Sequence, residues 1–541
     1  MNHELKAAEG SLVEAQVDDI HGLYRSGRLT PLELVNFYLN RIDLLDLNTD
    51  AGPPFNCIVC VSPSVREEAA ALGDEILRHG VIKPLHGIPV WVKDNIQVEG
   101  LPTTGGCLAL EEGVALRDAP LVGRLRAAGA IIMGKVGMTE LGIGSSEYST
   151  MSGRIGNALD PRNPPGGSSN GSAVAVSLNL GMLAVGVDDC ASITYPAALN
   201  SCVGLRPTAG LVSRAGLLSY SETETTPGPI CRTVMDAARM FDVLAGPATE
   251  AGFEMTTEAR LRGKRVGVIA ATDSVDFMTD VPPAVREAFA SRLAQLEDAG
   301  VTVVRDLRLE GFRWTRKAIL EHYNSQIESL RGRQAFPRSP HQLYTADRIS
   351  PVIRKVRGHP LFRFELSVRL PNVFAWSYRR VIEHNQRCFR RLLAAANVEV
   401  LISVTTPAPS RIATLARIPH LTVPAGHIEA EREMTAGGFV EGSRVPWGIS
   451  ILGAPGTDGR VLAVGYGFEQ VFKGRLEPAC GIADGSMADG FDVQAFNRLK
   501  REIAYQSYRS LQLSEDRRTY IHPTADEFRA LVRQITAAGG L

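Results

Sequence analysis

Short apolar runs alternate along this chain with helix-forming runs, and this alternation is the feature that most constrains its fold. Strand patterns occur at 55–61, 87–96, 129–136 and 183–187, and a helical pattern at 172–182 precedes the last of them. Glycines and prolines separate these runs, as expected for turns between short buried strands. Strands that alternate with helices favour a sheet flanked by helices. We therefore predict an α/β fold.

Composition and charge exclude several classes of function. The chain has 541 residues, and length alone would permit two or more domains. Lys+Arg number 58 against 59 Asp+Glu, so no global field attracts nucleic acid or an anionic membrane. The N-terminal residues 1–16 lack a signal-peptide pattern, and the eight cysteines lack the spacing of a disulfide framework. We expect a cytoplasmic protein with no nucleic-acid partner and no membrane span.

Changes of pattern divide the chain into segments. Thr30, Pro31 and Glu33 mark a helix start near the N-terminus, as N-cap, first-turn proline and capping-box partner. We predict a main unit over 1–479 and a separate helical extension over 480–541. Within the main unit we expect a helical N-terminal segment at about 10–50, a core at about 55–310, a helical cap-like segment at about 310–395 and strands that return at about 396–475.

A glycine- and serine-rich segment, 164–210, is the richest in potential chemistry. Its GGSSNGS run at 166–172 forms a loop before a helix. Such a loop points backbone N–H groups and hydroxyls into one space, which suits an anion or oxyanion. Alone, the run is more often a flexible turn. Two further elements give it weight, because Lys93 lies upstream in VWVKDN and Ser192 lies downstream in DDCASITYPAA.

Three motifs in this order resemble those of the amidase signature family. They are a lysine in a strand before Asp-Asn, a GGSS loop, and a serine followed by Ile-x-x-Pro-Ala and then Gly-Leu-x-Pro-Thr. The resemblance runs from about Leu12 to Phe472, so the extension after residue 480 lies outside it. It implies a single large α/β domain with a central mixed sheet flanked by helices. It also implies hydrolysis of a C–N bond without a cofactor.

The resemblance implies a catalytic triad of Ser192 as nucleophile, Ser168 as a bridging serine after a cis peptide bond, and Lys93 as base. A serine hydroxyl is a poor nucleophile until a base removes its proton. A lysine can act as that base only when neutral, and the apolar residues 90–92 provide a setting that lowers its pKa. Asp94 follows the lysine on the expected strand and should face the other way.

The resemblance also implies an oxyanion hole made of the backbone N–H groups of Asp189, Cys190, Ala191 and Ser192. Most members of the family have Thr-Gly-Gly-Ser or a near variant at these positions. The N–H groups survive the change of side chains. A residue other than glycine is nevertheless strained wherever φ is positive, and the added Cβ atoms approach the substrate carbonyl.

Two further departures surround this loop. Thr194 stands where the family usually has an arginine two residues after the nucleophile. Asp188 matches the family's aspartate, and we expect it to have lost a nearby positive partner. All three catalytic side chains are present, so we still predict an active enzyme.

The expected substrate contacts are Ser169, Met151, Ser152 and Gly153. By resemblance, the stretch at 151–153 lines the acyl side of the cleft. From the residues alone, it could equally be a loop that glycine permits.

Three functions remain open for this set of residues. We favour an amidohydrolase that cleaves a carboxamide, anilide or carbamate through an acyl-enzyme. One alternative is the amidase subunit of a glutamine-dependent tRNA amidotransferase, which needs partner subunits. The other is a non-catalytic, amidase-derived binding protein, suggested by the altered loop. We expect a small-molecule amide-type substrate and no metal or other cofactor, with a homodimer left open.

Overall fold

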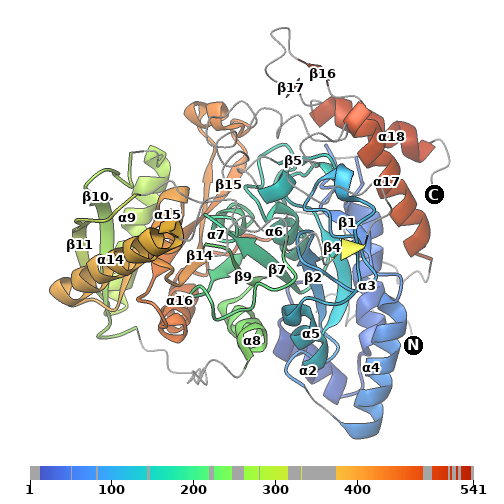
Figure 1. The fold of residues 1–541 in the computed structure, drawn as a ribbon, viewed down its shortest axis with the longest axis horizontal. Coiled ribbons are helices and arrows are strands. Elements are labelled where there is room, and N and C mark those ends of the chain that lie inside the picture. The colour runs from blue at the N-terminus through green and yellow to red at the C-terminus, as the bar shows by residue number, and fades with distance from the viewer. Residues whose placement is uncertain are drawn as a thin grey trace.

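The computed structural model places one long sheet at the centre of the molecule (Figure 1). It describes residues 12–49, 52–80, 83–142, 147–218, 224–246, 261–279, 281–314, 330–331, 373–478, 490–509, 512–513, 520–521 and 525–537. The sheet has 11 strands in the order β1-β4-β2-β7-β9-β8-β14-β15-β13-β10-β11. Its strands are β1 (Ile58–Val61), β2 (Pro89–Lys93), β4 (Ile131–Val136), β7 (Leu183–Asp188), β8 (Val203–Arg206), β9 (Thr226–Cys231), β10 (Arg265–Thr272), β11 (Thr302–Leu309), β13 (Val400–Val404), β14 (His420–Glu429) and β15 (Arg444–Leu452).

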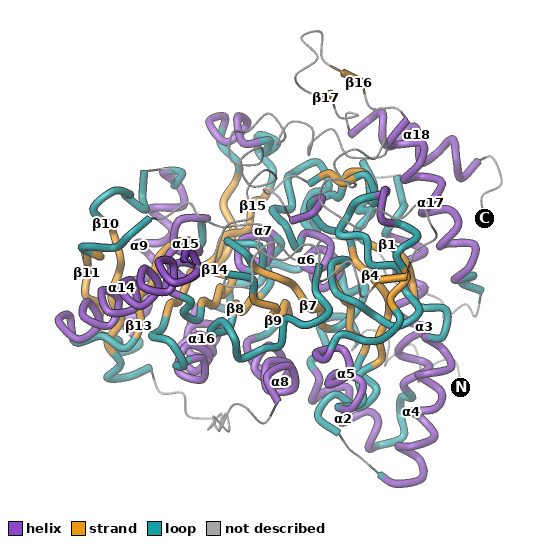
Figure 2. The backbone as a smooth tube through the Cα atoms, in the orientation of Figure 1, coloured by secondary structure: helices purple, strands orange, loops and turns teal. Residues whose placement is uncertain are grey.

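The sheet is mixed, as the resemblance implied. β2 pairs in parallel with β4 and β7, whereas β9 pairs antiparallel with β7 and β8. Helices surround it: α2 (Val17–Arg25), α3 (Pro31–Leu45), α4 (Val65–His79), α5 (Pro120–Ala127), α6 (Asn170–Ser177), α7 (Thr194–Leu199), α8 (Val234–Ala245), α9 (Pro283–Asp298), α14 (Val373–Ala396), α15 (Pro407–Ala416), α16 (Asp458–Phe472), α17 (Val493–Arg509) and α18 (Ala525–Ala537). Figure 2 shows the strands running through the interior with helices on the outside. The predicted α/β fold with a central mixed sheet flanked by helices is confirmed.

The strands that carry the candidate site are buried on both faces. Every residue of β2, β4 and β7 is buried, and so is every residue of α6, which packs on β2 and β7. Strands covered on both faces are expected to be almost continuously apolar, and Val90, Trp91 and Val92 follow that rule. A lysine at the end of such a strand therefore enters a dry interior.

The predicted start of α3 is confirmed. The Thr30 hydroxyl accepts a hydrogen bond from the Glu33 N–H at 3.2 Å, and the Thr30 N–H donates to the Glu33 carboxylate at 2.8 Å. Pro31 occupies the first turn, where its missing N–H costs nothing.

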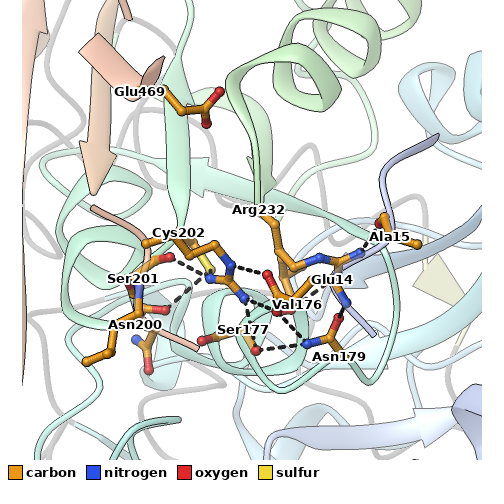
Figure 3. Close-up of polar contacts among 12 residues, drawn as sticks. Glu14, Ala15, Val176, Ser177, Asn179, Asn200, Ser201, Cys202, Arg232 and Glu469 are labelled. Atoms are coloured by element: carbon orange, nitrogen blue, oxygen red, sulfur yellow. Dashed lines mark hydrogen bonds and ion pairs between the residues drawn. The ribbon is translucent and has the colours of Figure 1, made fainter. Parts of the chain in front are cut away.

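The C-terminal end of α6 is fixed by a buried polar network (Figure 3). Arg232 donates to the carbonyl oxygens of Ala15 and Val176 at 2.7 and 3.4 Å. Asn179 donates to the Glu14 carboxylate at 2.7 Å and accepts from the Glu14 N–H at 2.9 Å. The network ties the N-terminal segment to the end of α6. The opposite end of the same helix carries the GGSS loop.

The two ends of the sheet are covered differently. β11 forms one end and packs against α9 and α14. β1 forms the other end and packs against α17, the first helix of the C-terminal extension (Figure 1). Within the predicted cap-like segment, 315–329 and 332–372 lie outside the described residues. The part that is described is not helical throughout, because β12 (Leu330–Arg331) pairs with β3 (Val114–Ala115) before α14 begins.

Candidate active site

Lys93 is the last residue of β2, and its side chain is fully enclosed. The residue is 1% exposed. Its Nζ lies 2.8 Å from the Ser168 Oγ, 2.8 Å from the Ser169 Oγ and 3.0 Å from the Val187 carbonyl oxygen. Burial lowers the pKa of the Lys93 ammonium to about 7, although the nearby Asp189 and Asp188 carboxylates act in the opposite direction. A substantial fraction of this lysine is therefore neutral near pH 7.

One placement of the protons of the neutral amine satisfies all the hydrogen bonds around Lys93. The Ser169 hydroxyl donates to the Val187 carbonyl at 3.2 Å and accepts from the Val187 N–H at 3.2 Å. A neutral amine has two hydrogens and one lone pair. Its hydrogens satisfy the Ser169 and Val187 oxygens, so the lone pair faces the Ser168 hydroxyl, which can donate a proton to it. This arrangement suits a base that receives its proton from Ser168.

Ser168 and Ser192 lie on two loops that are hydrogen-bonded to each other. The peptide bond between Gly167 and Ser168 is cis, as the resemblance implied. The Ser168 carbonyl accepts from the Thr139 N–H at 3.1 Å, and the Ser169 N–H donates to the Ser192 carbonyl at 3.1 Å. Ser192 follows β7, precedes α7 and is 4% exposed. The structure thus brings together the three elements that lie far apart in the sequence.

The loop expected to form the oxyanion hole is strained at one residue. Ala191 has a φ of 69°, in the left-handed region that glycine adopts without cost. Strain was expected at any residue of this loop with a positive φ, without a choice between Cys190 and Ala191, and Ala191 is the one that has it. Cys190, two residues before the candidate nucleophile Ser192, is solvent-exposed. Asp189 accepts a hydrogen bond from the Thr225 hydroxyl, and burial raises the pKa of its carboxyl.

The expectation that Asp188 lost its positive partner is wrong. Arg206, on β8, pairs with the Asp188 carboxylate at 2.8 Å and also donates to the Asp188 carbonyl at 2.8 Å. The other carboxylate oxygen accepts from the Ile193 N–H at 2.8 Å. Thr194, in place of the usual arginine, instead contacts the Ser410 hydroxyl at 3.0 Å. Arg206 was not among the residues predicted from the sequence, although it occupies the variable position of the Gly-Leu-x-Pro-Thr motif.

The four expected substrate contacts have well-defined partners. The Ser169 hydroxyl bonds to Lys93 and to both polar groups of the Val187 backbone. Met151 and Ser152 lie in the turn between the short strands β5 (Tyr148–Ser149) and β6 (Gly153–Arg154), and Gly153 is the first residue of β6. All three residues, called the Met151–Gly153 turn below, are buried. The Ser152 N–H donates to the Ser149 hydroxyl at 3.0 Å. Because the Ser169 hydroxyl bonds to both Lys93 and the Val187 backbone, Ser169 is placed to orient the Lys93 side chain.

Asp94 faces away from the candidate base, as predicted. Its carboxylate lies 3.5 Å from the Nζ of Lys135 on β4 and accepts a hydrogen bond from the Gly106 N–H at 3.1 Å. Cys57 and Cys60 are free thiols. Among the described residues, no group of histidine, cysteine and acidic side chains has the arrangement of a metal site. No helix in the same part of the chain is long and apolar enough to cross a membrane.

Comparison with known proteins gives a consistent picture. The family described as Amidase matches residues 33–462. A subunit of glutamyl-tRNA(Gln) amidotransferase from Symbiobacterium thermophilum is 30% identical over 84% of this chain and 96% of its own length. A peptide amidase from Stenotrophomonas maltophilia superposes with a TM-score of 0.70 at 28% identity, over 86% of this chain and 99% of that one. An amidase family protein from Bacillus anthracis gives 0.75 at 27% identity, over 88% and 95%.

Proposed function

Because this chain belongs to the amidase signature family, we propose that it cleaves the C–N bond of a carboxamide or related amide through an acyl-enzyme on Ser192. The observation that carries the proposal is the position of the Lys93 Nζ, buried and 2.8 Å from the Ser168 hydroxyl. A lysine in that setting can hold or release a proton near neutral pH, which general base catalysis requires.

In the proposed reaction, Ser192 attacks the amide carbon while its proton passes to Ser168 and the Ser168 proton passes to Lys93. The backbone N–H groups of residues 189–192 stabilise the oxyanion. Lys93 then returns its proton through Ser168 to the leaving nitrogen, and the C–N bond breaks. A water molecule then attacks the acyl carbon and passes a proton to Lys93 by the same route. That proton returns through Ser168 to the Ser192 oxygen as its bond to the acyl carbon breaks, and the carboxylic acid product leaves.

Among the alternatives, a role within a tRNA amidotransferase gains most from the comparisons. Several curated relatives, from bacteria and from grapevine, are named as a subunit of glutamyl-tRNA(Gln) amidotransferase. In that setting the leaving group would be ammonia from glutamine, and the reaction at Ser192 would be the same. The peptide amidase of known structure supports the hydrolysis of an amide substrate. The two functions differ in the substrate and in the need for partners.

The third alternative, a binding protein without activity, rests on the loop at Cys190 and Ala191. Ala191, with its left-handed φ, and the exposed Cys190 make this loop unlike the glycine pair common in the family.

The seven described cysteines are all free, which supports our proposal of a cytoplasmic, reducing location.

A substrate panel separates the three functions. The purified chain is assayed with glutamine, peptide C-terminal amides, anilides and carbamates, and labelled with a fluorophosphonate. We expect turnover and a label on Ser192, both absent from Ser192→Ala. Glutamine hydrolysis that needs added partner proteins and tRNA would favour the amidotransferase. A folded protein that neither turns over a substrate nor takes the label would contradict the proposal.

A further inference from the structure

Helix α17 of the C-terminal extension packs beside the Met151–Gly153 turn. Met151 packs in one cluster with Val59 and Leu108 of the core and Ala504 of α17. The Tyr148 hydroxyl lies 2.9 Å from the Ser507 hydroxyl of the same helix. This packing joins the turn to a part of the chain beyond the residues that the family matches.

α17 also completes the edge of the sheet. β1 is the terminal strand, so its outer N–H and C=O groups need partners. The Asn497 side chain accepts from the Val61 N–H and donates to the Val61 carbonyl, each at 2.9 Å. The Asn497 amide thus makes the two hydrogen bonds that a neighbouring strand would otherwise make with Val61. The extension is therefore fitted to this edge by directional bonds as well as by apolar contact.

A buried chain of hydrogen bonds runs from α17 to the turn. Lys500 is 4% exposed, and its Nζ lies 2.9 Å from the Asp46 carboxylate and also bonds to the Asn56 side-chain oxygen. The Asn56 amide nitrogen donates to the Ser152 carbonyl and, at 3.1 Å, to the Arg154 carbonyl. The side-chain oxygen of Asn56 thus bonds to Lys500 of the extension, and its side-chain nitrogen bonds to the turn. Lys500 orients this amide.

Apart from its contacts with α17, the turn is linked to the GGSS loop through residues 139 and 140. The Thr150 N–H donates to the Glu140 carboxylate at 2.7 Å, and the nearby Thr139 N–H donates to the Ser168 carbonyl at 3.1 Å. Gly137 lies so close to Ser152 that an added Cβ would come 2.7 Å from its hydroxyl oxygen. A displacement of the turn would therefore reach the walls of the candidate active site.

We propose that α17 supports a wall of the substrate-binding site, with Lys500 as a positioning residue that sets the Met151–Gly153 turn through Asn56. This inference rests on the proposed function, because it assumes that the turn contacts the acyl group of the substrate. Residues outside the family match would then help to determine which acyl groups the enzyme accepts. The affected property is selectivity among acyl groups.

The test compares two fluorophosphonates, one with a methyl group and one with an octyl chain on phosphorus, in the full-length protein. Lys500→Met removes the link at its origin. Asn56→Asp keeps an oxygen for Lys500 and tolerance of the left-handed φ of 51° but loses both N–H bonds to the turn. The matched control is Arg498→Met, which removes a charge from the exposed face of the same helix.

We expect both link variants to change the ratio of octyl to methyl labelling rates by about tenfold, because small displacements of a binding wall have large effects on a reacting group. Arg498→Met should keep the wild-type ratio. Asn56→Asp serves if Lys500→Met fails to fold. An unchanged ratio in a folded link variant would overturn the inference. If wild type takes neither probe, the proposed function fails instead.

Discussion

Two lysines lie buried on neighbouring strands of the sheet, and their surroundings differ. Lys93 on β2 contacts two serine hydroxyls and one carbonyl. Lys135 on β4 lies 2.6 Å from the Ile96 carbonyl, 3.1 Å from the Pro102 carbonyl and 3.5 Å from the Asp94 carboxylate. Burial lowers the pKa of both ammonium groups. Burial is common to both lysines, and of the two only Lys93 contacts a hydroxyl, from which it takes a proton in the proposed mechanism.

We expect the largest effect from replacing Lys93, the proposed base. Lys93→Met removes the amine and leaves a side chain of similar size in the apolar interior. We expect kcat to fall by about 10⁴-fold or more, as for a member of a catalytic unit. Amide turnover under saturating substrate measures it, with circular dichroism as the check on folding. Activity within tenfold of wild type would remove Lys93 from the mechanism.

Lys135→Met is the matched variant on the neighbouring strand. It leaves the Asp94 carboxyl without its buried partner, and we expect the free energy of unfolding to fall by about 3–5 kcal/mol. Denaturant unfolding measures the loss. The molecules that remain folded should keep their kcat within about threefold, because no reacting group is touched. A large loss of kcat in folded protein would mean that the two lysines share the chemistry.

The pH dependence sharpens the comparison at Lys93. With a pKa of about 7, the neutral amine is the minor form at lower pH and the major form above it. We therefore expect kcat/KM to rise about tenfold per pH unit below pH 7 and to level off above it. A steady-state profile from pH 5 to pH 9, about two units on either side, measures this. A profile that still rises steeply at the upper end would indicate an ordinary lysine.

The smallest effect concerns the loop that receives the oxyanion. Ala191→Gly relieves a residue with a φ of 69°. An L-residue in the left-handed region carries a cost of about 1 kcal/mol relative to glycine, so we expect a gain in stability of that order. Chemical denaturation of the variant beside wild type measures it. A loss of stability would show that the alanine is well accommodated.

The parts predicted from sequence are those in which the signal is local. The apolar residues before Lys93 indicated a buried strand, and β2 is buried throughout. Glycines and serines before an apolar run indicated a loop that leads into a helix, and α6 begins at Asn170. Such patterns describe a few consecutive residues, whose conformation and burial follow from their own chemistry.

The parts that escaped prediction depend on contacts between distant segments. Arg206 reaches Asp188 only because β9 pairs with both β7 and β8, and neither motif contains that pairing. Likewise, the bonds of Lys500 to Asp46 and Asn56 join the two ends of the chain. One sequence shows which residues can form ion pairs, but the sheet order decides which ones meet.

The pKa of Lys93, measured in the intact protein, decides whether this lysine can act as the base. Selective ¹³C labelling of lysine Cε, with Lys93→Arg to assign the signal, gives the pKa of this one group by NMR in the intact protein. We predict a midpoint at about pH 7, because burial lowers the pKa of the Lys93 ammonium to about that value. A midpoint near 10.5, the value for an unperturbed lysine, would mean that Lys93 is charged at neutral pH and cannot be the base.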